Sequence, residues 1–298
     1  MKKVMLTVDS GVGTLDDGID KIPVQILCDT DGKEYLDGLN INNKKIIEDL
    51  EKGYTYKTSS PLFDSYRNNF TKHLVNGNDV IHLSMSSGIS EGSYNLSNLV
   101  ANLVNEDYDN SVYVVDTLNA TTGGIIISEY AKNLINSGLQ ATEVIDKLEE
   151  FKKYIKTTFF VPNPDGFIRS GRNKTDLSTT DKAKLILASA AVRTGFKFKV
   201  QFNNNGNLVQ DGILRGKTHN CFRQLVANIV NEENVEDYDN SLVVVGNVLK
   251  DKVEMDEIKD YIKSLKYFKE VIEKDFPSAV AAYGCRDLCG ISLVKKMK

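Results

Sequence analysis

Short runs of β-branched and apolar residues alternate with longer helical patterns in the first half of the chain. The pattern predicts strands over 3–8, 22–27, 79–83 and 111–116, and helices over 41–53, 61–77, 93–105 and 122–138. Strands that alternate with helices of this length are typical of a parallel sheet covered on both faces. We therefore expect the first half to form a three-layer α/β/α unit.

The pattern changes from about Tyr154 onwards. Predicted strands over 156–161 and 196–202 alternate polar and apolar residues, and the turn sequence Asn203–Asn207 leads into Leu208. This is a hairpin signal, and it predicts a partly antiparallel sheet with helices on one side. We therefore divide the chain into an N-terminal parallel-sheet domain over 1–155 and a C-terminal, two-layer α/β domain with a mixed or antiparallel sheet over 156–298.

Composition and charge exclude several functional classes. The 298 residues include 37 basic and 41 acidic side chains, for a formal net charge of −4. Proteins that bind nucleic acid need a basic face, and so do proteins held electrostatically on anionic membranes. No apolar run approaches the roughly 18–20 residues that span a bilayer, and Asp9 interrupts the apolar N-terminal stretch too early for a signal peptide. We expect no nucleic-acid partner and no stable membrane insertion.

The four cysteines are few and scattered, at Cys28, Cys221, Cys285 and Cys289. They do not form the dense pattern of a disulfide framework, and Cys285 and Cys289 have no second ligand pair for zinc. We expect reduced thiols in a cytoplasmic protein, with no metal and no other cofactor. No heptad repeat or exposed apolar seam is visible, so a monomer is expected.

Clusters of Ser, Thr and Gly lie at the ends of predicted strands or at the starts of predicted helices, where parallel-sheet proteins place their binding sites. The clusters are Asp9–Gly11, Thr58–Pro61, Ser84–Ser93 and Thr121–Gly124. Taken alone, Thr58–Pro61 is an ordinary helix N-cap. Hydroxyls and free amides at a helix N-terminus also bind carboxylates or phosphates. Because neither Thr58–Pro61 nor Ser84–Ser93 contains Lys or Arg, the pattern favours a ligand with one modest negative charge.

One of these clusters contains a literal Gly-x-Ser-x-Gly, Gly88–Gly92, which raises the hypothesis of a serine esterase that uses Ser90. Two observations count against it. Ser90 lies about seven residues beyond the strand end at Leu83, whereas a nucleophile elbow follows its strand directly. His219 is the one histidine late enough in the chain to serve as base, and no His-Gly-Gly-Gly loop is present.

Taken in order, the clusters resemble the DegV family of bacterial fatty-acid-binding proteins. The resemblance rests on five segments in the order and approximate spacing of the family: Asp9-Ser10 after the opening strand, Ile22-Pro23-Val24 with Tyr35-Leu36-Asp37, Thr58-Ser59-Ser60-Pro61, Ser86–Tyr94, and Val115-Asp116-Thr117 before Gly123-Gly124. Further on, Gly171-Arg172 is similar to the end of a Gly-Gly-Arg loop of the family.

The resemblance implies a two-domain fold that binds a long-chain fatty acid in a buried tunnel between the domains. Thr58 and Ser90 match the family residues that hold the carboxylate, so Ser90 would be a hydrogen-bond donor and the protein a binder rather than an enzyme. We expect supporting roles around this site for a second group of residues: Ser59, Ser87, Gly88, Gly92 and Thr121.

The resemblance also implies a partner, the ATP-binding subunit of a fatty acid kinase, with Arg172 near the face on which it docks. The sequence departs from the family in three places. No Lys-Pro-Ile segment is visible around Thr194–Phe196, before the predicted hairpin of the second domain. Glu91 occupies a position where the family usually has glycine, and the segment Ala281–Gly290 lacks the histidine that members often carry near the carboxylate. A lipid carrier or sensor without a kinase partner is therefore the alternative.

Overall fold

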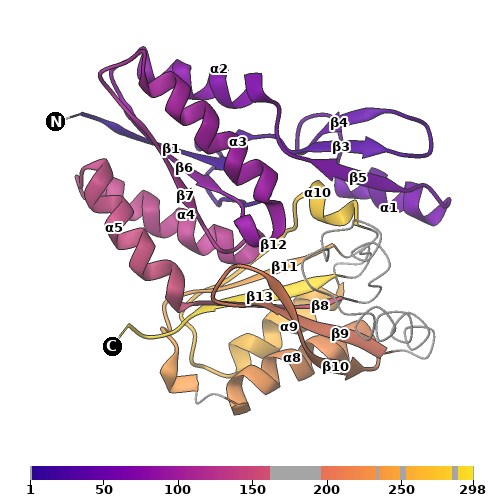
Figure 1. Cartoon of the computed structure of the whole chain (residues 1–298). Coiled ribbons are helices and arrows are strands. Elements are labelled where there is room, and N and C mark those ends of the chain that lie inside the picture. Colours follow the sequence, from indigo (N-terminus) through magenta and orange to yellow (C-terminus); the bar gives the residue numbers. More distant parts are fainter. Residues whose placement is uncertain (1, 162–195, 233–234, 249–252, 284–287, 298) are drawn as a thin grey trace.

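The computed structural model describes residues 2–161, 196–232, 235–248, 253–283 and 288–297. Figure 1 shows the first half of the chain above and the second half below, with helix α4 running between their sheets. The chain has a mixed α/β fold, with a parallel sheet in the first half and a separate mixed sheet in the second. The expected fold class is confirmed, whereas the exact domain boundary at 155/156 stays a prediction.

The first sheet has four parallel strands in the order β2-β1-β6-β7: β1 (Val4–Asp9), β2 (Asp20–Ile22), β6 (Asp79–Ser84) and β7 (Val112–Asp116). Helices α2 (Phe63–Leu74) and α3 (Ser87–Asn105) cover one face, around the buried rings of Tyr66 and Phe70. Helices α4 (Thr121–Asn136) and α5 (Ala141–Phe151) cover the other. Every residue of β6 is buried, as expected for a strand with helices on both sides.

A small antiparallel sheet and one helix extend from this unit. The sheet contains β3 (Gln25–Cys28), β4 (Glu34–Leu36) and β5 (Tyr56–Ser59) in the order β4-β3-β5, and helix α1 (Asn43–Glu51) lies between β4 and β5 in sequence. The prediction of a single strand over 22–27 is wrong, because β2 ends at Ile22 and β3 begins at Gln25 in a different sheet. Pro23 has no amide hydrogen for the ladder, so the chain leaves the first sheet there.

The second sheet has six strands in the order β10-β9-β8-β13-β11-β12. These are β8 (Ile155–Val161), β9 (Phe196–Phe202), β10 (Leu208–Arg215), β11 (Val243–Asn247), β12 (Val271–Asp275) and β13 (Cys289–Val294). Its pairs are antiparallel except β11–β12, and the hairpin predicted at Asn203–Asn207 joins β9 to β10. Helices α8 (Thr218–Glu232) and α9 (Val253–Ser264) pack on one face around Phe222.

Helix α4 contacts both sheets and so joins the two halves. The Thr122 and Ser292 hydroxyls form a hydrogen bond of 2.7 Å between α4 and β13. Glycine at the start of α4 permits this close approach, because a Cβ on Gly123 would lie 2.3 Å from the hydroxyl of Thr157, and one on Gly124 would lie 2.3 Å from the carbonyl of Val12. The short helix α10 (Ser278–Ala281) lies near α1 and brings the C-terminal part of the chain back towards the first half.

Candidate functional site

Three loops at the carboxyl ends of neighbouring parallel strands meet at one cavity. Gly11 follows β1, Met85 and Ile89 follow β6, and Thr121 follows β7, and all four line the cavity. Ligands of open α/β sheets bind at this edge, because the strand ends expose loops and helix N-termini there. The sequence-based expectation about the position of the site is consistent with this arrangement.

The cavity has a volume of about 610 Å³ and lies between the two halves of the chain. The second half supplies an apolar wall from three strands and from the region around α10: Phe159, Val161, Val200, Phe202, Leu208, Val209, Ala279, Val280 and Leu288. Among the described residues, no charged side chain lines the cavity; its polar side chains are Thr58, Thr121, Asn203, Asn207, Gln210 and Tyr283. Such a site suits a long apolar ligand with a small polar group.

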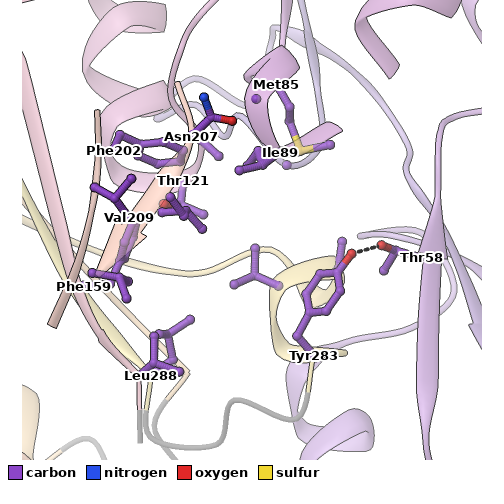
Figure 2. Close-up of a pocket in the computed structure, with 18 of the residues that line it drawn as sticks. Thr58, Met85, Ile89, Thr121, Phe159, Phe202, Asn207, Val209, Tyr283 and Leu288 are labelled. Atoms are coloured by element: carbon purple, nitrogen blue, oxygen red, sulfur yellow. Dashed lines mark hydrogen bonds between the residues drawn. The ribbon is translucent and has the colours of Figure 1, made fainter. Parts of the chain in front are cut away.

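Two hydroxyl groups meet at one end of the cavity. Figure 2 shows the hydroxyls of Thr58 and Tyr283 pointing at each other, and they form a hydrogen bond. Thr58 lies in the middle of β5, where it pairs with Ile26 of β3, whereas Tyr283 follows α10. The interpretation of Thr58–Pro61 as a helix N-cap is wrong, since α2 begins at Phe63 with Leu62 as its N-cap. Thr58 is therefore held by a β-ladder rather than by a helix cap.

The Ser-rich loop after β6 enters helix α3 through a kink. Ser86 is the N-cap, and its hydroxyl accepts a hydrogen bond of 3.2 Å from the amide of Gly88. Ser90 has non-helical dihedrals (φ −143°, ψ 59°), so the straight part of α3 starts after it. The Ser90 hydroxyl is buried and lies 2.8 Å from the hydroxyl of Ser93. The sequence pattern predicts that this helix starts at Ser93, six residues later than its start in the structure.

The β9–β10 hairpin packs against the same loop. The hydroxyl of Ser86 donates a hydrogen bond of 2.7 Å to the carbonyl of Gly206. A Cβ on Gly88 would lie 2.5 Å from that same carbonyl oxygen, so only glycine allows the turn to approach this closely. Gly206 itself has φ +72°, a conformation that glycine adopts without strain. The hairpin, which carries Phe202 and Val209 of the apolar wall, is thus fastened over the cavity.

A buried carboxylate holds the loop after β6 in place. Asp9 accepts hydrogen bonds from the phenol of Tyr66 (2.7 Å), the hydroxyl of Ser84 (3.0 Å) and the amide of Met85 (2.9 Å), and Nε2 of His82 lies 3.3 Å away. Burial alone would raise the pKa of the Asp9 carboxyl. The hydrogen bond and the charge of His82, together with the hydrogen bonds from Tyr66 and Met85, outweigh this effect and hold the pKa of Asp9 below its ordinary value. Asp9 therefore positions Met85 at the cavity wall.

A second buried carboxylate holds α10. Asp37 accepts hydrogen bonds from the hydroxyl of Ser10 (2.7 Å) and from the amide of Ser278 (2.9 Å) at the start of that helix. Burial raises the pKa of Asp37, and these hydrogen bonds offset only part of the rise. Since α10 and the turn after it supply Val280 and Tyr283, Asp37 fixes the C-terminal side of the cavity to the first half.

The structure brings three of the predicted site residues to the cavity wall: Thr58, Gly88 and Thr121. Ser90 is adjacent to the lining residue Ile89 but is not itself among the lining residues. Arg172 lies outside the described residues. Tyr283 was missed, because its contact with Thr58 spans 225 residues and leaves no local pattern in the sequence.

The other predicted supporting residues lie beside the cavity rather than in it. Ser59 is exposed on β5, and the amide of Ser87 donates a hydrogen bond of 3.2 Å to Asp116. A Cβ on Gly92 would lie 2.8 Å from the hydroxyl of Ser60, so Gly92 lets the loop before α2 approach α3. His219, the base of the esterase hypothesis, lies in the first turn of α8.

Within the described ranges, no three His, Cys, Asp or Glu side chains gather in a way that could hold a metal ion. None of the helices in those ranges combines the length and apolar character that crossing a membrane requires.

Comparison with known proteins places the chain in a family. The model of uncharacterised proteins of the DegV family matches residues 7–296. A DegV domain-containing protein of Clostridium perfringens is 27% identical over 177 residues, which span 58% of this chain and 62% of that relative. A second, from Streptococcus pyogenes, is 27% identical over 232 residues, or 78% of this chain and 75% of that protein.

Solved structures share the fold. A DegV family protein from Eubacterium eligens loaded with heptadecanoic acid has a TM-score of 0.80 at 18% identity, covering 98% of this chain and 100% of that one. The fatty acid kinase B3 protein of Streptococcus pneumoniae, loaded with linoleic acid, has a TM-score of 0.81 at 16% identity, covering 99% of this chain and 100% of that one. With the family match over 7–296, the conclusion is that this chain belongs to the DegV family.

Proposed function

We propose that the protein binds a long-chain fatty acid in the cavity between its two halves, with the carboxylate at the Thr58–Tyr283 end. The observation that carries the proposal is an apolar cavity of about 610 Å³ that has paired hydroxyls at one end and no charged side chain among its described lining residues. The structures of DegV proteins loaded with fatty acids support the choice of ligand.

The energetics fit this ligand. Burial of about fourteen methylenes, as in a sixteen-carbon acid, contributes about 11 kcal/mol at about 0.8 kcal/mol each. Each hydrogen bond to the carboxylate contributes about 1.5–3 kcal/mol. The chain therefore supplies most of the affinity, whereas Thr58, Tyr283 and the nearby Ser90 fix the orientation of the acid in the cavity.

The test is native mass spectrometry of the protein after incubation with a mixture of saturated and unsaturated fatty acids, followed by identification of the bound species. We expect one acid per chain, with weaker binding in Thr58→Val, Tyr283→Phe and Ser90→Ala. Tyr108→Phe, in the loop after the C-terminal end of α3, is the matched control and should bind like the wild type. A folded protein that takes up no fatty acid refutes the proposal.

We further propose that the bound acid is presented to the ATP-binding subunit of a fatty acid kinase. In that reaction a carboxylate oxygen attacks the γ-phosphorus of ATP, the bond to the bridging oxygen breaks, and ADP leaves as the acyl phosphate forms. The likeness to the kinase B3 protein supports this role, and the absence of a histidine from Ala281–Gly290 favours the alternative of a carrier or sensor. Trapping an acyl hydroxamate after addition of such a subunit and ATP separates the two roles.

A further inference from the structure

Thr121 has a backbone conformation that a β-branched residue rarely adopts. It is the first residue of α4 and has φ +53°, in the left-handed region. Such a conformation costs a non-glycine residue free energy, and strained residues of this kind concentrate at functional sites. Thr121 is also among the residues that line the cavity.

The hydroxyl of Thr121 is buried without a hydrogen-bond partner among the described residues. The residue is 4% exposed, and its Oγ1 is one of the few buried side-chain atoms left unpaired there. The neighbouring Thr122 behaves differently, because its hydroxyl is bonded to Ser292 at 2.7 Å. An unpaired buried hydroxyl destabilises the fold, so two unfavourable features coincide at one residue of the cavity wall.

This hydroxyl lies away from the proposed carboxylate end. Figure 2 shows Thr121 on the side of Phe159 and Val209, across the cavity from Thr58 and Tyr283. A second cavity of about 540 Å³, lined also by Asp37 and Lys274, borders Thr121 too, so this residue stands in the wall between the two. A plain hydrocarbon chain that runs past Thr121 offers its hydroxyl no partner, whereas an oxygen on the chain does.

We infer that Thr121 is a specificity-determining residue for fatty acids that carry a hydroxyl or oxo group along the chain, and that its Oγ1 hydrogen-bonds this oxygen. The inference rests on the proposed function. It deepens that function by naming an oxygenated acyl chain as the preferred ligand class. Ala120, the N-cap of α4, supplies no side-chain cap and lines the same wall as Thr121.

The experiment compares octadecanoic acid with its 7-, 10- and 12-hydroxy derivatives, competed in equal amounts and measured by native mass spectrometry. We expect the wild type to prefer at least one hydroxy acid over octadecanoic acid by about three- to ten-fold, the effect of one net hydrogen bond. Thr121→Val keeps the β-branched shape and should abolish this preference, so that the hydroxy acids lose affinity relative to octadecanoic acid. Thr121→Ser restores the hydroxyl and should restore the preference.

Other outcomes overturn the inference. An equal loss of all four acids in Thr121→Val would mean that Thr121 holds the carboxylate itself. An oxygen subsite at this residue would be excluded if the wild type prefers none of the three hydroxy acids. It would also be excluded if Thr121→Val leaves unchanged the ratio of bound hydroxy acid to bound octadecanoic acid. Uptake of octadecanoic acid by the wild type shows in the same experiment whether the proposed function holds independently of Thr121.

Discussion

Replacing Gly88 by alanine tests whether the β9–β10 hairpin closes the cavity. The added Cβ would lie 2.5 Å from the carbonyl oxygen of Gly206 and 2.8 Å from the amide nitrogen of Asn207. The turn is already tightly bonded, since Oδ1 of Asn203 accepts hydrogen bonds of 3.0 Å from the amides of both Asn205 and Asn207. The hairpin therefore has to move as a unit rather than yield locally.

The size of the effect follows from these distances. Moving the carbonyl of Gly206 out to the ordinary contact distance of 3.4 Å displaces the turn by about 0.9 Å. The hydrogen bond from Ser86 to that carbonyl, 2.7 Å long, then stretches to about 3.6 Å and is lost. Ser86 still accepts from the amide of Gly88, but leaving the buried O–H of Ser86 without an acceptor costs about 1–3 kcal/mol. This corresponds to about five- to 150-fold faster ligand release if the closed hairpin retains the ligand.

The assay is stopped-flow displacement of a fluorescent fatty acid from the wild type and from Gly88→Ala. Gly18→Ala is the matched control, because a Cβ there meets only the side chain of Asp16 at 3.1 Å. We expect a faster release rate in Gly88→Ala and an unchanged rate in Gly18→Ala. If Gly88→Ala is folded, less stable and still releases the ligand at the wild-type rate, the hairpin is not the closing element.

Two further predictions concern the support and the size of the cavity. The pKa of Asp9 is lower in the folded protein than its ordinary value of 3.8. The ionised carboxylate therefore stabilises the fold fully above pH 3.8, and this stabilisation is lost as the pH falls through the folded-state pKa. In denaturant unfolding, the free energy of unfolding of the wild type should exceed that of Asp9→Asn at pH 6, and the difference should shrink at pH 3. An equal difference at the two pH values would contradict this reasoning. Phe202→Ala removes a ring from the apolar wall and should shift the bound acids towards longer or branched chains in native mass spectrometry, whereas an unaltered chain distribution would show that Phe202 does not limit the chain.

Sequence patterns predicted what depends on local order. The strands β6 and β7 and the helix α4 follow from periodicity, and the loops after β1, β6 and β7 could be placed at one edge of the sheet because parallel strands end there. The predicted strand over 22–27 failed because a mainly apolar segment, interrupted only by Gln25, hid the break at Pro23. The lesson is that a proline inside such a run should count as the end of a ladder.

The parts of the site that depend on distant contacts were not predictable. Thr58 pairs through β5 with β3, and Tyr283 approaches it from α10, 225 residues later. The tight contact of Gly88 with Gly206 likewise joins two loops from different halves of the chain. In each case the local sequence fits a simpler interpretation, a helix cap or a flexible glycine, and only the fold shows the partner.

The distribution of charge bears on the proposed binding of a carboxylic acid in a cavity of neutral side chains. The buried carboxylates Asp9 and Asp37 lie behind the wall, where they accept hydrogen bonds from the backbone of Met85 and of Ser278. They fix the loop after β6 and the helix α10 in place without exposing charge to the ligand. The hydroxyl of Tyr283, just beyond α10, is then preorganised, so it loses little conformational entropy when it donates to a carboxylate. In the proposed complex, the acyl chain would therefore supply the affinity and the neutral donors would select the orientation.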